Sequence, residues 1–170
     1  MLTGKNLATI GSTEYVDIAG FTKVPAKIDT GADSSSVWAS DIKMEKDGTL
    51  VFKLFDKSSS FYTGERIKTK DYIVKSVRSS HGDTQIRYRV KLPLRINGVE
   101  FISTFTLADR TRNHFPILIG RRTLEGKFVI DVTKSKVIRE KTPKSHKLNA
   151  ELNENPYEFH KKYIEKGKNS

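Results

Sequence analysis

Apolar and polar residues alternate along several short stretches of residues 7–138. Residues 23–28 read Lys-Val-Pro-Ala-Lys-Ile, and residues 50–54 and 92–96 alternate in the same way. A period of two is the signature of a half-buried β-strand. Asp47-Gly48 and Asn97-Gly98 are turn signals next to these stretches. Further candidate strands are residues 16–21, 72–74, 86–90, 99–107, 115–119, 128–132 and 137–138. Many short strands at this spacing predict a mainly β protein built as a small barrel or sandwich.

The pattern changes after residue 140. Residues 141–147 are polar and contain a proline, which predicts a basic linker. A helix is then expected, because Asn155 suits the cap, Pro156 suits the first helical position and Glu158 follows three residues after the cap. The helix is expected to end at Gly167.

We therefore expect two parts, a barrel domain over residues 1–140 and a linker with a C-terminal helix over residues 141–170. The length of 170 residues is enough to bury a core. Cysteine is absent, which removes disulfides, a thiolate nucleophile and cysteine-based zinc sites. We find no apolar run of about 20 residues and no signal peptide, so no membrane association and a cytoplasmic location are expected.

The charge is strongly positive. The chain has 31 Lys and Arg against 20 Asp and Glu, which gives a formal net charge of +11 at pH 7. Such an excess attracts acidic partners, whether acidic peptide, nucleic acid or anionic lipid. A solvated basic surface that keeps the protein soluble explains it equally well.

The sharpest candidate for chemistry is Asp29-Thr30-Gly31-Ala32, at the end of the strand predicted over residues 23–28. The strand would fix the carboxylate rigidly, and Gly31 would let backbone approach closely. The Thr30 hydroxyl is available for a local hydrogen bond or one to a second subunit. An ordinary polar turn after a strand has the same composition.

A second motif, Ile119-Gly120-Arg121 within the run 117–121, lies about ninety residues later. Together the two motifs resemble the retropepsins, with their Asp-Thr-Gly-Ala loop and downstream Gly-Arg segment leading into a short helix. The resemblance implies a small closed acid-protease barrel with one short helix after the Gly-Arg segment. It also implies that Ala32, Asp33, Ile119, Gly120 and Arg121 support the site, with an Asp33–Arg121 ion pair.

The chain is more closely similar to a prokaryotic retropepsin-like family often labelled "ATP-dependent zinc protease". The similarity covers roughly residues 7–138 and includes Ser79-Ser80-His81-Gly82, Arg87-Tyr88 and the stretch 115–131. Retropepsins close a hairpin flap over their substrate. The resemblance places a flap at Ser79, Ser80, His81 and Gly82, although a plain surface hairpin has the same pattern. Candidate substrate contacts are Arg78, Arg87, Arg89 and Arg110.

The resemblance implies an aspartic peptidase, in which two neighbouring carboxylates share one proton and activate water. The sequence contains one Asp-Thr-Gly, so one chain supplies half a site. A homodimer with Asp29 of both chains on its twofold axis would complete it. Asp29, Thr30 and Gly31 are the expected catalytic residues, with no cofactor.

No metal site is expected despite the family label. The four histidines are scattered, none shows the spacing of zinc ligands, and position 38 is Trp where many members have His. ATP is no better supported, because the glycines of residues 120–127 have the wrong spacing for a phosphate loop.

The resemblance implies a peptide or protein substrate. Some members of the similar family act beside glutamate ligases, which implies the trimming of acidic polyglutamate tails. The rival hypothesis is a non-catalytic barrel that binds acidic peptide or nucleic acid. Nucleic acid is the less favoured partner, because most aromatic residues occupy strand positions suited to core packing. A dimer that acts only as a scaffold is the third and least favoured hypothesis.

Overall fold

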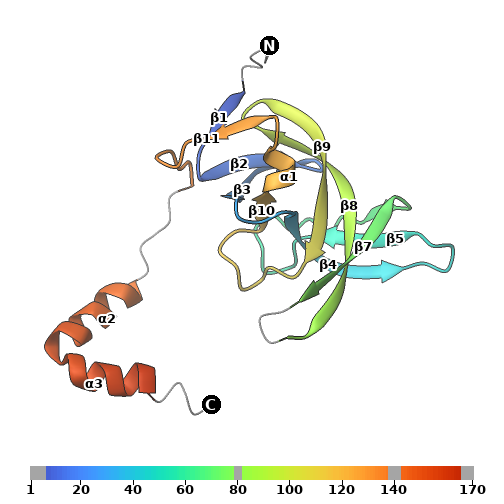
Figure 1. Cartoon of the computed structure of the whole chain (residues 1–170). Helices are drawn as coiled ribbons and strands as arrows, with labels where there is room; N and C mark the ends of the chain where they lie inside the picture. Colours follow the sequence, from blue (N-terminus) through green and yellow to red (C-terminus); the bar gives the residue numbers. More distant parts are fainter. Residues whose placement is uncertain (1–6, 79–81, 138–142, 166–170) are drawn as a thin grey trace. The chain divides into compact units, whose positions relative to one another are not determined.

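The computed structural model describes residues 7–78, 82–137 and 143–165 (Figure 1). The chain divides into two compact units, Met1–Val137 and Ile138–Ser170. The domain boundary expected at residue 140 falls outside the described residues.

The first unit consists of strands and one short helix. They are β1 (Ala8–Ile10), β2 (Thr13–Ile18), β3 (Phe21–Asp29), β4 (Ser35–Met44), β5 (Leu50–Leu54), β6 (Ile67–Thr69), β7 (Tyr72–Arg78), β8 (Thr84–Ile96), β9 (Val99–Ala108), β10 (Ile117–Gly120), α1 (Arg121–Leu124) and β11 (Phe128–Ile130).

These strands form a closed barrel, as the sequence predicts. The hydrogen-bonded order runs β10–β3–β2–β8–β9–β4, and β4 pairs again with β10, so six strands close the ring (Figure 1). β5 and β6 extend the sheet beyond β4, and β1 pairs with β11 as a separate two-stranded sheet. The alternating side chains of these strands fill the core, with Phe52, Phe105, Leu107, Ile117 and Ile119 almost fully buried.

β10 lies between β3, which ends at Asp29, and β4, which begins six residues later. It pairs in parallel with β3, where Gly120 stands opposite Asp29, and antiparallel with β4, where Leu118 stands opposite Ser36. Residues far apart in sequence are thereby fixed beside one another. Ile117 and Ile119 are buried and Leu118 is half-buried between them, which explains the continuous apolar run.

Three details differ from the sequence prediction. β8 is one strand rather than two, because Val90, Leu92, Leu94 and Ile96 continue a single alternation of buried side chains. β1, β4 and β6 were not anticipated. Val137 is outside any strand, and its backbone N–H donates to Thr13 Oγ1 (3.0 Å).

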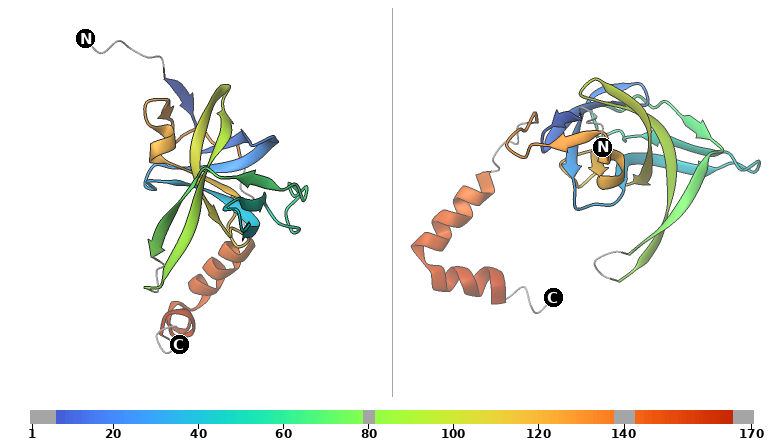
Figure 2. Two further views of the ribbon diagram at one scale, coloured as in Figure 1. Left: turned by 90° about the vertical axis from the view of Figure 1, so that its right-hand side faces the viewer. Right: turned by 45° about the horizontal axis from the view of Figure 1, so that its top comes forward.

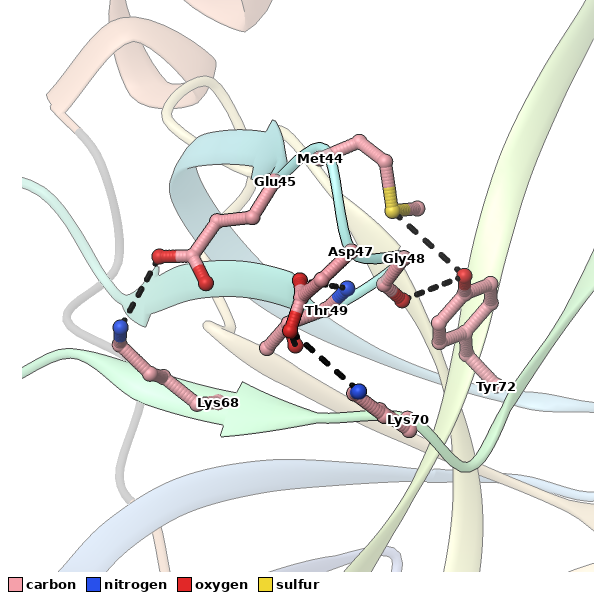
Figure 3. A network of polar contacts seen from close by, with 8 residues as sticks. All are labelled: Met44, Glu45, Asp47, Gly48, Thr49, Lys68, Lys70 and Tyr72. Carbon is pink, nitrogen blue, oxygen red and sulfur yellow. Dashed lines mark hydrogen bonds and ion pairs between the residues drawn. The ribbon is translucent and has the colours of Figure 1, made fainter.

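β7 and β8 form a hairpin whose far part extends beyond the other barrel strands in both views of Figure 2. Its base is anchored at Tyr72, whose hydroxyl donates to the carbonyl oxygen of Gly48 (2.8 Å) in the β4–β5 turn (Figure 3). The Tyr72 ring also packs edge-on against Tyr88 across the hairpin, with 5.8 Å between ring centroids.

The β4–β5 turn is itself tied to the neighbouring strand. Lys68 pairs with Glu45 (2.9 Å) and Lys70 with Asp47 (3.3 Å), as Figure 3 shows. Hydrogen bonds from the backbone and side chain of Thr49 hold the pKa of Asp47 below its ordinary value, and Lys70 contributes further. The turn is therefore an ordered support for the base of the hairpin.

The second unit is helical, with α2 (Pro143–Glu154), α3 (Pro156–His160) and a π-helical turn over Lys161–Glu165. The predicted cap is present, since Asn155 Oδ1 accepts from the Glu158 N–H (3.2 Å). The linker prediction for residues 141–147 is wrong from Pro143 onward, because proline fits the first helical position and so begins α2 there. Residues 141 and 142 lie outside the described part.

None of the helices in the described ranges has the length and apolar character needed to cross a bilayer.

The anchor of the hairpin gives a first prediction. Replacing Tyr72 with Phe removes the hydroxyl that reaches Gly48 and should lower the free energy of unfolding by about 1 kcal/mol. Amide hydrogen exchange in β7 and the paired half of β8 should accelerate. Tyr15→Phe, on an exposed side chain, is the control and should change neither quantity. Equal exchange rates in both variants would show that Tyr72 does not anchor the hairpin.

Candidate active site

Asp29 ends β3 with its side chain turned away from the core. Val24, Ala26 and Ile28 alternate into the core, so Asp29 follows Lys27 on the opposite face. The carboxylate is 30% exposed, and its Oδ1 accepts a hydrogen bond from the Gly31 N–H (3.2 Å). The Ala32 N–H donates to the Asp29 carbonyl oxygen (3.2 Å). The tight turn thus holds one carboxylate oxygen and leaves the side chain accessible.

The Asp29 loop, residues 29–34, is braced from behind by Gly120. A Cβ at position 120 would lie 2.5 Å from the Ser34 carbonyl carbon and 2.8 Å from the Ala32 carbonyl oxygen. Only glycine permits this approach of two backbones. The next residues hold the loop directly, since the Arg121 N–H donates to Ala32 O (2.7 Å) and the Arg122 N–H to Asp33 O (3.2 Å).

Buried hydroxyls continue this brace. The Gly120 N–H donates to Ser35 Oγ (3.0 Å), which lies 2.6 Å from Thr123 Oγ1. Thr123 Oγ1 in turn lies 2.8 Å from Ser103 Oγ on β9. A chain of hydrogen bonds therefore connects the Gly-Arg segment, the start of β4, α1 and β9.

Arg121 and Asp33 form the ion pair that the family resemblance implies. Both side chains are more than half exposed, at 62% and 54%, so solvent screens the pair and its contribution to stability is small. Its geometric effect is to join the end of the Asp29 loop to α1.

Lys27 was missed as a site residue. Its Nζ lies 3.8 Å from Asp29 Oδ2, and its side chain is 45% exposed. The signal was present in the sequence, because residues two apart on a strand share a face. The alternation by itself marks Lys27 only as a polar position.

In the sequence, the expected flap residues 79–82 lie between β7 and β8, which pair as a hairpin. Pairing runs from Tyr72 opposite Val90 to Arg78 opposite Thr84. Ser79, Ser80 and His81 lie outside the described residues, so their role in a flap stays a prediction. Gly82 is exposed and has a φ of +89°, which suits glycine at a turn.

The predicted arginines do not all lie together. Lys75 and Arg87 are directly opposite across the hairpin and share one face, and Lys75 Nζ donates to Ser34 Oγ (3.1 Å) at the end of the Asp29 loop. Arg78 lies further out, at the exposed end of β7. Sequence reasoning missed Lys75. The sequence could have indicated it only if the pairing of its strand with the strand of Arg87 had been known.

Arg110 is partly buried and holds the entry to β10. Its Nε donates to Phe115 O (2.9 Å), and its Nη1 donates to Ser36 Oγ (2.9 Å). Burial lowers the pKa of Arg110, and the positive charge of Arg87 lowers it further. Arg87 and Arg110 therefore belong to one region of positive potential next to the start of β4.

The brace predicts unequal costs for two glycine substitutions. Gly120→Ala should lower the free energy of unfolding by about 1–3 kcal/mol or more, because the new methyl group overlaps backbone atoms. Gly31→Ala should cost much less, since its Cβ would meet only Asp29 Oδ1, at 3.5 Å. Denaturant unfolding of both variants measures the difference. Equal stability loss would contradict the brace at Gly120.

Comparison with known proteins identifies relatives of this chain. The chain is 27% identical over 141 residues to a "Probable alpha-L-glutamate ligase" from Shewanella pealeana (strain ATCC 700345 / ANG-SQ1), covering 80% of this chain and 31% of that protein. A protein of the same name from Desulfotalea psychrophila (strain LSv54 / DSM 12343) is 26% identical over 127 residues, covering 72% of this chain and 27% of that one. The chain thus spans less than a third of these relatives.

A solved structure supports the fold. A protein of unknown function from Legionella pneumophila subsp. pneumophila str. Philadelphia 1 superposes with a TM-score of 0.59 at 24% identity, over 75% of this chain and 95% of that one. The family model described as "Retropepsin-like aspartic endopeptidase RimB" matches residues 9–142. The chain belongs to this RimB-like family of retropepsin-like proteins.

Proposed function

We propose that this protein is an aspartic peptidase whose active site is completed by a second copy of the chain. The observation that carries the proposal is the Asp29 carboxylate, accessible at the end of β3 and held by the Gly31 N–H. Its loop is locked by the close approach of Gly120. A carboxylate held rigidly and still exposed is suited to act on a bound water.

The chemistry requires a second carboxylate. The sequence contains a single Asp-Thr-Gly, so Asp29 of a second copy is the natural partner across a twofold axis. When two carboxylates share one site, their like charges repel, so one keeps a proton while the other stays ionised. The ionised group takes a proton from the attacking water, and the protonated group donates a hydrogen bond to the peptide carbonyl.

The cations around the Asp29 loop favour an acidic substrate. Lys27 flanks the carboxylate, and Lys75, Arg87 and Arg110 lie by Ser34 and Ser36 at the start of β4. Positive potential next to a reaction centre concentrates and orients anionic peptides. The names of the relatives, which are called glutamate ligases, support glutamate-rich protein tails as the substrate class.

Asp29→Asn provides the decisive test. Wild-type protein should cleave members of a mixed peptide library, and Asp29→Asn should lose the activity by at least about a thousandfold, because the neutral amide cannot accept the proton. A metal chelator should leave wild-type cleavage unchanged. Asp47→Asn, in the β4–β5 turn, is the matched control and should remain active.

Mixing the two proteins tests the shared site. If each site needs both copies of Asp29, an equal mixture that exchanges subunits should show about a quarter of the activity of wild type alone at the same total concentration. A value of about one half would mean that each chain works by itself. Absence of cleavage by wild type from acidic to neutral pH would favour a barrel that binds acidic peptide without hydrolysing it.

Charge preference can be measured with paired peptides. Glutamate-rich peptides should be cleaved with a kcat/KM at least about tenfold above that of their glutamine analogues at low salt, and the ratio should fall as salt screens the attraction. Equal rates for the two series would remove the acidic-substrate proposal while leaving the peptidase proposal intact.

A further inference from the structure

A hollow of about 300 Å³ lies on β9 beside α1, and three cations line it. Arg89 comes from β8, Arg122 from α1, and Lys127 follows α1. The other polar residues that line it are serines and threonines, including Ser34, Ser103 and Thr104. No carboxylate lines this β9 hollow among the residues that the structure describes.

The three cations are not neutralised locally. Arg89 Nε is buried without a hydrogen-bond partner. Lys127 Nζ lies over the Phe101 ring, 5.0 Å from its centroid, and donates a long hydrogen bond to the Glu125 carbonyl oxygen (3.5 Å). Within the described ranges, no ion pair to a carboxylate involves any of the three. Three like charges around one concavity repel one another, and a bound anion would relieve that repulsion.

The buried hydroxyl chain supplies a donor to the same hollow. Ser35 Oγ accepts from the Gly120 N–H, and Ser35 is only 1% exposed. The arrangement that leaves no buried hydroxyl hydrogen unpaired has Ser35 donating to Thr123 and Thr123 donating to Ser103. The hydrogen of Ser103, on a half-buried side chain that lines the hollow, then remains available for an acceptor.

Ser34 is shared by the β9 hollow and the candidate active site. Ser34 ends the Asp29 loop and lines the hollow, while its hydroxyl accepts from Lys75 of the hairpin. Asp29 does not line the hollow, so a group bound there would not contact the reacting carboxylate. The Gly120 brace connects the two sites through the same hydroxyl chain.

We propose that the β9 hollow is an anion subsite that binds a side-chain carboxylate of the peptide, remote from the scissile bond. This inference rests on the proposed peptidase function. Arg122 and Arg89 present guanidinium groups suited to bidentate contact with a carboxylate, and Ser103 adds a neutral donor. The subsite makes selectivity for acidic peptides depend on positions beyond the residues next to the cleaved bond.

Binding to the Asp29→Asn protein tests the subsite without cleavage. A hexaglutamate peptide should shift the backbone amide NMR signals of Ser103 and Thr104, and a hexaglutamine peptide should not. Arg122→Gln combined with Lys127→Gln should weaken hexaglutamate binding at least about tenfold, since two charged hydrogen bonds are lost. The matched control, Lys43→Gln with Lys46→Gln on and beside β4, should weaken it by less than about threefold, through net charge alone.

Equal weakening by the two double variants, or no glutamate-dependent shift at Ser103 and Thr104, would overturn the subsite even if the wild type cleaves peptides. Inorganic phosphate that competes fully at millimolar concentration, together with equal binding of hexaglutamate and hexaglutamine, would also overturn it, in favour of a phosphate site. Conversely, glutamate-selective binding that depends on Arg122 and Lys127 would support the subsite even if no cleavage is found and the peptidase proposal fails.

Discussion

The close approach of Gly120 to the backbone of Ala32 and Ser34 is the constraint on which the site depends. It exists because β10 lies between β3 and β4, in parallel with one and antiparallel to the other. A side chain at position 120 would push the Asp29 loop outward. With glycine there, three backbone N–H groups, those of residues 120, 121 and 122, hold the loop and the start of β4. The position of the carboxylate is thus set by strand order more than by its own contacts.

The polar residues around this brace have a common logic. Ser35 and Thr123 are buried polar side chains whose hydroxyls satisfy one another and the Gly120 N–H. A buried hydroxyl without a hydrogen-bond partner costs free energy. Every hydroxyl in this series of hydrogen bonds therefore needs its partner. Ser103, the last residue in this series of hydrogen bonds, lines the β9 hollow beside its three cations. The same hydrogen bonds therefore support the carboxylate loop and shape a neighbouring surface for anions.

Charge is distributed unevenly about the barrel. On the β4–β5–β6 side, lysines meet carboxylates in ion pairs, as at Glu45 and Asp47. Around the Asp29 loop and the β9 hollow, Lys75, Arg89 and Arg122 have no such partner among the described residues. Uncompensated like charges repel one another, and a bound anion would relieve that repulsion. The net charge of +11 alone therefore says less about partners than the location of the cations that have no carboxylate partner.

The sequence determined a mainly β fold and the Asp29 motif, because alternation of buried side chains and an Asp-Thr-Gly turn are local patterns. The closed barrel was implied by the resemblance of the Asp29 and Gly-Arg motifs to the retropepsins, since alternation alone fits a barrel or a sandwich. The sequence also predicted the Asn155 cap, which depends on three neighbouring residues. β4 escaped prediction, since Ser35 and Ser36 look like loop residues until their hydroxyls meet Gly120 and Arg110. The start of α2 at Pro143 escaped for a similar reason, because proline marks a linker as readily as a first helical turn. Only the tertiary structure decided which cations share a surface. The β7–β8 hairpin carries Lys75 and Arg89, and the distant helix α1 carries Arg122, yet all three lie around Ser34. Side-chain proximity of that kind has no local signature.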